Sequence, residues 1–172
     1  MWTNFLLFSL LTICVFTDIK ERKIYNSILF PFLCAAWILH VVIAGETGLK
    51  ETLLGTAVGL CILLIPYLLG GMGAGDVKLL AVIGAIKGMD FVLMASVYMA
   101  FTGGGMAILI LLFRKGVRAR MMQIMYVLHG LRNGVKTPML SEKEGIKTTY
   151  PYGIAIALGA IFQAIKLKGI TL

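Results

Sequence analysis

The chain has 172 residues, of which 59% are apolar and only 14% are charged, a composition far from that of an average soluble domain. Its mean hydropathy of +0.93 is typical of a polytopic membrane protein, and we expect one membrane domain over residues 1–172. The net charge of +8 does not indicate nucleic-acid binding, because the basic residues lie between apolar runs instead of forming one basic and aromatic surface. Membrane topology and anionic lipid explain these charges better.

The first apolar run covers residues 2–17 and is slightly short for a membrane span, but tilt or bilayer thinning extends its reach. The charged residues 18–23 follow it directly. A secretory signal would carry positive charge before the apolar run and a small-residue cleavage site after it, and this run has neither. The positive cluster therefore predicts an N-terminus outside the membrane and places Asp18 at the cytoplasmic end of the first span.

Two further apolar runs, residues 27–44 and 52–69, predict the second and third spans, with a short outer loop between them at residues 45–51. Pro31 is tolerable because it lies near the start of its helix. Pro66 predicts a kink near the end of the third span.

Glycines are prominent at the end of this region. Gly55 and Gly59 have the spacing that permits close packing of membrane helices, although such pairs also occur by chance. The glycine-rich residues 70–76 then predict a cytoplasmic loop, at the end of which one carboxylate, Asp76, lies at the edge of an apolar segment. Ionisable groups at such places are costly and usually face a protein interior or a water-filled cavity.

Three more apolar runs complete the chain. Residues 77–87 make about half a span, residues 91–113 are long enough to cross fully, and residues 150–164 form a short sixth run. Asp90, in the turn between the first two of these runs, is expected to terminate or cap a helix. Six spans with both ends outside follow only if residues 77–87 do cross the membrane.

The basic residues 114–120 indicate the cytoplasmic side, and residues 114–149 predict a cytoplasmic loop with an amphipathic surface helix at about residues 118–131. This topology assigns twelve Lys and Arg residues to the inside and four to the outside. The asymmetry supports the predicted orientation.

The main chemical signal is that two of the eight acidic residues, Asp18 and Asp76, are predicted at cytoplasmic ends of spans. Two neighbouring carboxylates share a proton, so the ionised one can activate water while the protonated one donates to a scissile carbonyl oxygen. Such a pair hydrolyses an amide without a metal, and either residue can take either role. The alternative is that Asp18 pairs with Lys20 or Arg22 while Asp76 caps a helix that starts at Val77.

Other kinds of site receive no support from the sequence. Cys14, Cys34 and Cys61 lie inside apolar runs without C-x-x-C spacing, so we expect small core residues and neither disulfides nor a zinc site. His40 and His129 are predicted on opposite sides of the membrane and cannot form a metal pair. The glycine run also lacks the Lys-Ser/Thr ending of a phosphate-binding loop, and we expect no cofactor.

Three segments resemble one known family. Residues 73–79 read G-A-G-D-V-K-L, which resembles the G-x-G-D motif of intramembrane aspartyl proteases and, in this longer form, the type IV prepilin peptidases. Residues 18–26 are similar to the first catalytic stretch of that family, in which an aspartate and a basic segment are followed by Ile-Pro-Asn. Asn26 matches the asparagine of that stretch, and Tyr25 stands where proline is usual. Residues 150–159 are similar to its last-helix Pro-(Tyr/Phe)-Gly segment.

The resemblance implies an all-α membrane bundle and an aspartic endopeptidase with Asp18 and Asp76 as the catalytic pair. It would remove the leader of type IV prepilins or pseudopilins at the cytoplasmic face of a bacterial or archaeal cytoplasmic membrane. The implied partners are these substrates and membrane lipid, with no nucleic acid and with the oligomeric state open. Substrate-binding or supporting roles are implied for Asn26, Gly73, Gly75, Lys78, Pro151 and Gly153.

Larger members of that family carry a cytoplasmic domain with paired C-x-x-C zinc ligands and also N-methylate the new terminus. This sequence contains no such cysteines, so we expect a peptidase without methyltransferase activity, similar to the short members that serve tight-adherence (Flp-type) pili. A presenilin-like protease is a first alternative, but its Tyr-Asp and Pro-Ala-Leu elements are absent. A non-catalytic transporter or pilus-assembly subunit is the second, although a transporter should show an internal repeat.

Overall fold

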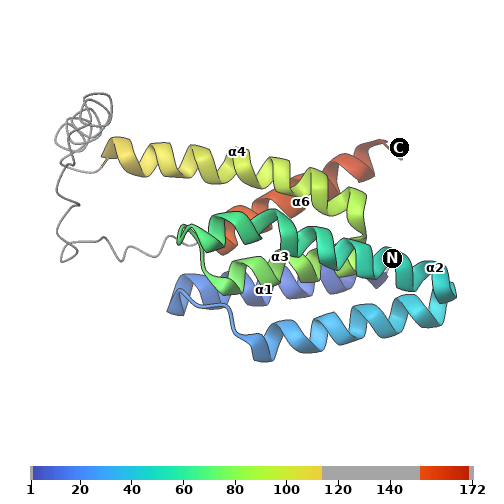
Figure 1. Ribbon diagram of the computed structural model, residues 1–172. Helices are drawn as coiled ribbons and strands as arrows, with labels where there is room; N and C mark the ends of the chain where they lie inside the picture. Colours follow the sequence, from blue (N-terminus) through green and yellow to red (C-terminus); the bar gives the residue numbers. More distant parts are fainter. Residues whose placement is uncertain (1, 114–151, 171–172) are drawn as a thin grey trace, which may run out of the picture. The chain divides into compact units, whose positions relative to one another are not determined.

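A computed structural model describes residues 2–113 and 152–170, and within these ranges every regular element is an α-helix. The predicted all-α architecture is therefore confirmed for the described chain (Figure 1). The helices are α1 (Trp2–Glu21), α2 (Asn26–Leu68), α3 (Ala74–Lys87), α4 (Met89–Phe113) and α6 (Tyr152–Ile170). The basic loop at residues 114–149, its amphipathic helix, His129 and Pro151 lie outside the described residues.

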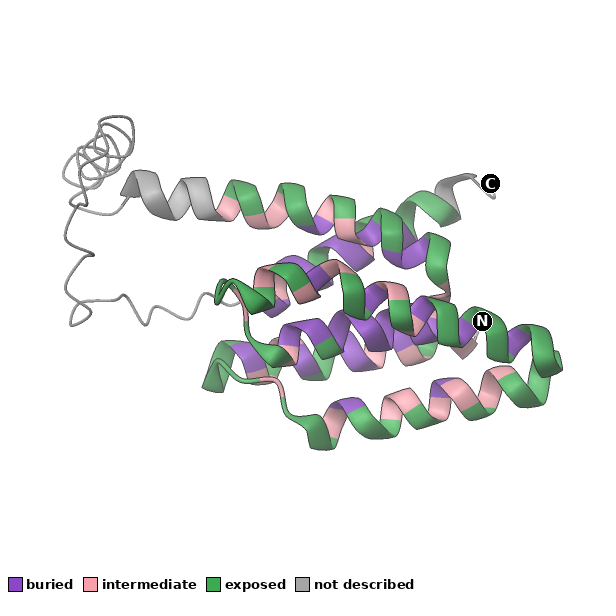
Figure 2. Cartoon of the chain, viewed as in Figure 1, coloured by how far each residue is buried: buried purple, intermediate pink, exposed green. Residues whose placement is uncertain are grey.

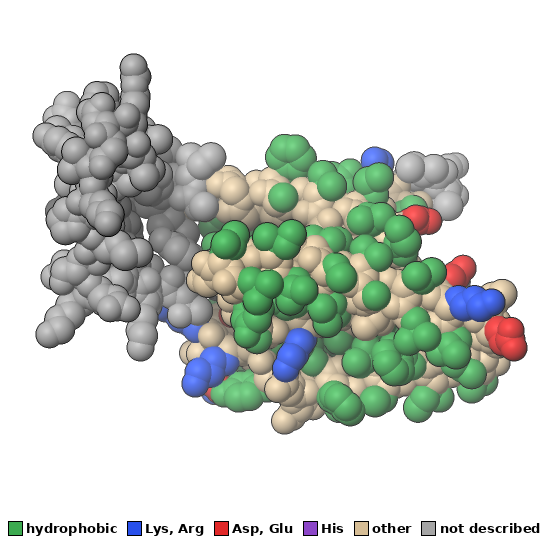
Figure 3. Space-filling model, in the orientation of Figure 1, with side chains coloured by type: hydrophobic (Ala, Val, Ile, Leu, Met, Phe, Trp, Pro, Cys, Tyr) green, Lys and Arg blue, Asp and Glu red, His purple; other side chains and the backbone are tan. Residues whose placement is uncertain are grey.

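The chain divides into two compact units, residues 1–103 with 150–172, and residues 104–149. All contacts discussed below lie within the first unit. Helices α1 and α2 are long and apolar enough to cross a membrane by length and composition, and residues 152–167 form a shorter apolar helix. Large apolar side chains cover much of the visible face in Figure 3. Phe5, Phe30 and Phe101 are each at least 67% exposed, as lipid-facing residues of a membrane protein are.

Helix α2 is two helical limbs joined at Gly45, which has φ 58° and ψ −136°. The predicted loop at residues 45–51 is therefore wrong, because one glycine with a positive φ reverses the chain and residues 46–51 are already helical. The limbs pack closely beside this turn, where a Cβ on Gly48 would lie 2.4 Å from the His40 carbonyl oxygen. Each limb has close to the roughly 20 residues that a membrane span needs.

Helix α3 is the central element, since it contacts α1, α2 and α6 and is buried along most of its length (Figure 2). Its closest neighbour is the second limb of α2. A Cβ on Gly84 would lie 2.0 Å from the Gly55 carbonyl oxygen, and one on Gly59 would lie 2.5 Å from the Leu80 carbonyl oxygen. The predicted packing role of Gly55 and Gly59 is thus confirmed, and the buried Thr52 hydroxyl adds a 2.5 Å hydrogen bond to the Ala85 carbonyl.

Two further predictions need correction. Helix α3 begins at Ala74 and not at Val77, so Asp76 lies within its first turn instead of before it. Of the three cysteines, only Cys14 is a core residue, because Cys34 and Cys61 are exposed. Asp90 lies in the first turn of α4, where a helix-capping carboxylate was expected.

Candidate active site

Asp18 lies in the last turn of α1 and is only 4% exposed. The first turn of α6 packs directly against it, and a Cβ on Gly153 would lie 2.6 Å from Oδ2 of the carboxylate. The backbone N–H groups of Gly153 and Ile154 approach the same carboxylate. Its Oδ2 has no hydrogen-bond partner among the described residues. The start of a helix is a favourable place for negative charge, so these N–H groups offset part of the cost of burying the Asp18 carboxylate.

Asp76 is the third residue of α3 and is 8% exposed. Its Oδ2 accepts a 3.2 Å hydrogen bond from the Gly73 backbone N–H, so the carboxylate caps its own helix. Asp76 precedes the apolar run that starts at Val77. Burial raises the pKa of the Asp76 carboxyl to about 6, the Gly73 bond opposes this shift, and the charge of Asp18 adds to it.

The charge of Asp18 is the smallest of the three causes that shift the pKa of Asp76, and the two residues come from different helices far apart in the sequence. Both also lie beside the N-terminal turn of a helix, Asp18 beside α6 and Asp76 within α3. The first unit thus contains two buried carboxyl groups, each beside the N-terminal turn of a helix.

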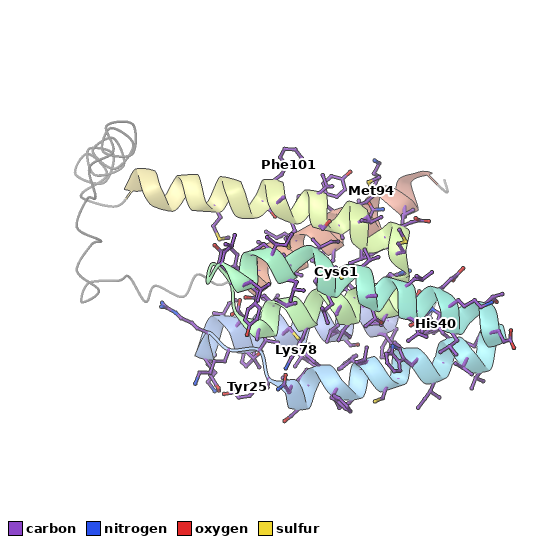
Figure 4. The ribbon with its side chains drawn as sticks, in the orientation of Figure 1. Tyr25, His40, Cys61, Lys78, Met94 and Phe101 are labelled. Carbon is purple, nitrogen blue, oxygen red and sulfur yellow. The ribbon has the colours of Figure 1, made fainter. Side chains whose placement is uncertain are left out.

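The supporting candidates Asn26 and Lys78 also meet, because the Lys78 Nζ donates a 3.0 Å hydrogen bond to the Asn26 Oδ1. Figure 4 shows Lys78 and Tyr25 toward one end of the helices and His40 toward the other. Gly75 faces the chain just before α2, where a Cβ would lie 2.9 Å from the Cβ of Ile24.

Sequence reasoning missed two residues near the site. Ile24 contacts Gly75 through its backbone as well as its side chain, and such contacts leave no signal in a sequence. Tyr25, which stands where the resembling family has proline, donates its hydroxyl hydrogen to the Glu21 carboxylate. That contact joins residues four apart, a spacing that could have been noticed in the sequence.

A cavity of about 550 Å³ lies elsewhere in the first unit and is no part of this site. None of the candidate site residues lines this cavity. Its lining includes the polar residues Thr3, His40, Lys87, Asp90 and Gln163. No group of three or more His, Cys, Asp or Glu side chains suited to a metal ion occurs among the described residues. The carboxylate pair is therefore the strongest chemical feature of the described chain.

Comparison with known proteins identifies the family of this chain. The sequence profile of the type IV leader peptidase family matches residues 5–115, a range that contains Asp18 and Asp76. A protein of Bacillus subtilis (strain 168), named prepilin leader peptidase/N-methyltransferase, is 37% identical over 100 residues. This alignment covers 55% of the present chain and 39% of that protein, so the chain spans less than half of its relative. No solved structure matches the chain.

The profile match covers well over half of the 172 residues and contains the glycine-rich motif together with the first aspartate. It ends before α6, so Gly153 is tied to the site by its contact with Asp18 alone. The chain belongs to the type IV leader peptidase family.

Proposed function

We propose that this protein is an aspartic endopeptidase that removes the leader peptide of type IV prepilins or pseudopilins. The observation that carries the proposal is that the Asp18 and Asp76 carboxyl groups are both buried and that each lies beside the N-terminal turn of a helix. The family match and the named relative in Bacillus subtilis support the substrate class.

In the proposed reaction the two carboxyl groups share one proton. The ionised carboxylate removes a proton from a water molecule, whose oxygen attacks the scissile carbonyl carbon, while the other carboxyl group donates its proton to the carbonyl oxygen. Collapse of the tetrahedral intermediate then breaks the C–N bond. The carboxyl group that took the proton from water gives it to the leaving amine, and the other carboxylate takes a proton back from one hydroxyl of the intermediate as the carbonyl re-forms. The carboxyl pair regains its starting state, with no covalent intermediate.

We further propose a multi-pass topology with the carboxylates at the cytoplasmic face. The asymmetric distribution of Lys and Arg supports this orientation, because basic residues concentrate in cytoplasmic loops. Peptidase activity without N-methylation is also part of the proposal, since the three cysteines of this sequence form no C-x-x-C pair.

The test is co-expression with a tagged prepilin from the same genome, followed by mass spectrometry of the processed product. Wild type should remove the leader, whereas Asp18→Asn and Asp76→Asn should each slow cleavage by about 10²-fold to 10⁴-fold, the usual contribution of an acid-base group. Asp90→Asn is the matched control, because this carboxylate is exposed and lies in the first turn of α4, away from the pair.

The mass of the new N-terminus reports methylation in the same experiment, and an added methyl group would contradict that part of the proposal. Wild-type rates in either active-site variant, with membrane insertion intact, would disprove the carboxyl pair. A wild type that cleaves none of the prepilins offered would disprove the peptidase function itself.

A further inference from the structure

The short connection between α1 and α2 is fixed to the same helical turn that carries Asp18. Arg22 adopts a left-handed conformation with φ 52° and donates its backbone N–H to the Asp18 carbonyl oxygen at 3.0 Å. At the other end of the connection, Tyr25 occupies the N-cap position of α2, and its hydroxyl donates a hydrogen bond to the Glu21 carboxylate. Hydrogen bonds from both ends of the connection therefore attach it to the last turn of α1.

The same connection is also held against α3, at two points that flank Asp76. On one side, Gly75 lies so close to Ile24 that a Cβ would be 2.9 Å from the Ile24 Cβ and 3.2 Å from its carbonyl oxygen. On the other side, Lys78 donates its 3.0 Å hydrogen bond to Asn26, the first residue of α2. Residues 24–26 thus contact α3 immediately before and shortly after its carboxylate.

We propose that Lys78 and Asn26 form a positioning pair that sets the separation of the Asp18 and Asp76 carboxyl groups. Neither residue touches the reacting atoms in this role, which rests on the proposed peptidase function. The hydrogen bond holds the connection to α3, the connection holds the last turn of α1, and the two turns carry the two carboxyl groups. Losing the bond lets the carboxyl groups drift from the geometry that proton transfer needs.

The exposed location of the Lys78–Asn26 pair distinguishes a role in positioning the carboxyl groups from a role in the stability of the fold. Both side chains are exposed, and an exposed polar contact contributes little to the stability of the whole fold. Variants of Lys78 and Asn26 should therefore fold and insert normally, while the rate of the chemical step, which depends on carboxyl geometry, should fall.

The experiment is a double-mutant cycle on purified full-length protein in detergent, with a purified prepilin as substrate. The variants are Lys78→Met, Asn26→Ala, the double variant, and an exchange variant that combines Lys78→Asn with Asn26→Lys. Lys50→Met is the matched control, because Lys50 is an exposed lysine in the second limb of α2. Asp18→Asn is measured in parallel to establish that cleavage depends on the carboxyl pair.

Each single variant should lower kcat by about threefold to tenfold with little change in KM, the size expected for one hydrogen bond. The double variant should be no slower than the slower single variant, because both changes break one contact. The exchange variant, which can remake the bond with donor and acceptor reversed, should regain part of the lost rate. Amide hydrogen exchange at residues 22–26 should accelerate in both single variants and stay unchanged in Lys50→Met.

Multiplying effects in the double variant, or a raised KM with unchanged kcat, would show that each residue contacts the substrate independently and would overturn the inference. Unchanged hydrogen exchange at residues 22–26 would overturn it as well. In these cases wild-type cleavage and its loss in Asp18→Asn leave the peptidase function standing. Absence of cleavage by wild type would instead reject the peptidase function, and the positioning role with it.

Discussion

At the scale of single residues, the contact between Gly153 and Asp18 is the tightest constraint on the site. A Cβ at position 153 would lie 2.6 Å from Oδ2 and 3.0 Å from Cγ of the carboxylate. Real side chains do not approach so closely, so the carboxylate or the start of α6 must shift. We expect Gly153→Ala to slow leader cleavage by about 10²-fold, the cost of displacing a catalytic group by about 1 Å.

Single-turnover rates of prepilin cleavage measure this effect. The matched control is Gly103→Ala, because a Cβ at that helical position would lie 3.5 Å from the Ala155 Cβ, an ordinary van der Waals distance. Equal rates for Gly153→Ala and wild type would mean that α6 does not position Asp18.

Burial of Asp76 predicts a pH-dependent effect on stability. Its pKa is raised from 3.8 to about 6, so between these values the folded protein binds more protons than the unfolded chain. The free energy of unfolding therefore falls as pH rises through this window, and above it the ionised carboxylate costs on the order of 2 kcal/mol. Asp76→Asn carries no such charge, so it should raise Tm near neutral pH and change it little near about pH 4.

Thermal unfolding in detergent at the two pH values measures this difference. Asp90→Asn, which removes an exposed carboxylate, is again the control. A lower Tm of Asp76→Asn at neutral pH would show that the ionised carboxylate stabilises the fold, contrary to the argument from burial.

At the scale of helices, the contact between α2 and α3 depends on glycine at both sides. A Cβ on Gly55 would lie 2.1 Å from the Gly84 carbonyl oxygen, and the reverse distance is 2.0 Å. A methyl group at either position must push the helices apart, since both obstacles are backbone atoms. We expect Gly84→Ala to lower stability by about 1–3 kcal/mol, the usual cost of overpacking.

Thermal unfolding of Gly84→Ala in detergent tests this contact. Gly103→Ala is the control, because a Cβ there would lie at an ordinary van der Waals distance, 3.5 Å from the Ala155 Cβ. Cleavage should fall together with stability, because α3 also carries Asp76. A Tm equal to that of wild type would show that the two helices can separate without cost.

The helices themselves were largely predictable, whereas their ends and turns were not. Apolar runs located α1, α4 and both limbs of α2, because a span requires a minimum apolar length. The reversal at Gly45 was missed, since a positive φ at one glycine replaces a whole loop and leaves no composition change. The start of α3 at Ala74 was missed because glycine-rich sequence predicts a loop, while the Asp76 cap stabilises a helix there.

At the scale of the whole molecule, short motifs indicated the family, but not which surfaces face the core. Lipid-facing and core-facing side chains of a membrane helix are equally apolar, so hydrophobic patterning cannot distinguish them. Cys34 and Cys61 show this, because both lie in apolar runs and both are exposed. The pairing of Lys78 with Asn26, 52 residues apart, likewise follows only from the folded arrangement.

The antiparallel packing of α3 on α2 sets the depth of the candidate site. Gly59 lies against Leu80, so Asp76, four residues before Leu80, is level with about Leu63, while α2 continues to Leu68. The carboxylate is thus recessed by roughly 7 Å from the end of α2, at 1.5 Å per residue. The peptide bonds of an intact helix are hydrogen-bonded within that helix, so a substrate helix must unwind before it can present one to a carboxyl group. Under the proposed peptidase function, we therefore expect leader junctions that unwind at low cost to be cleaved in preference to stable apolar helices.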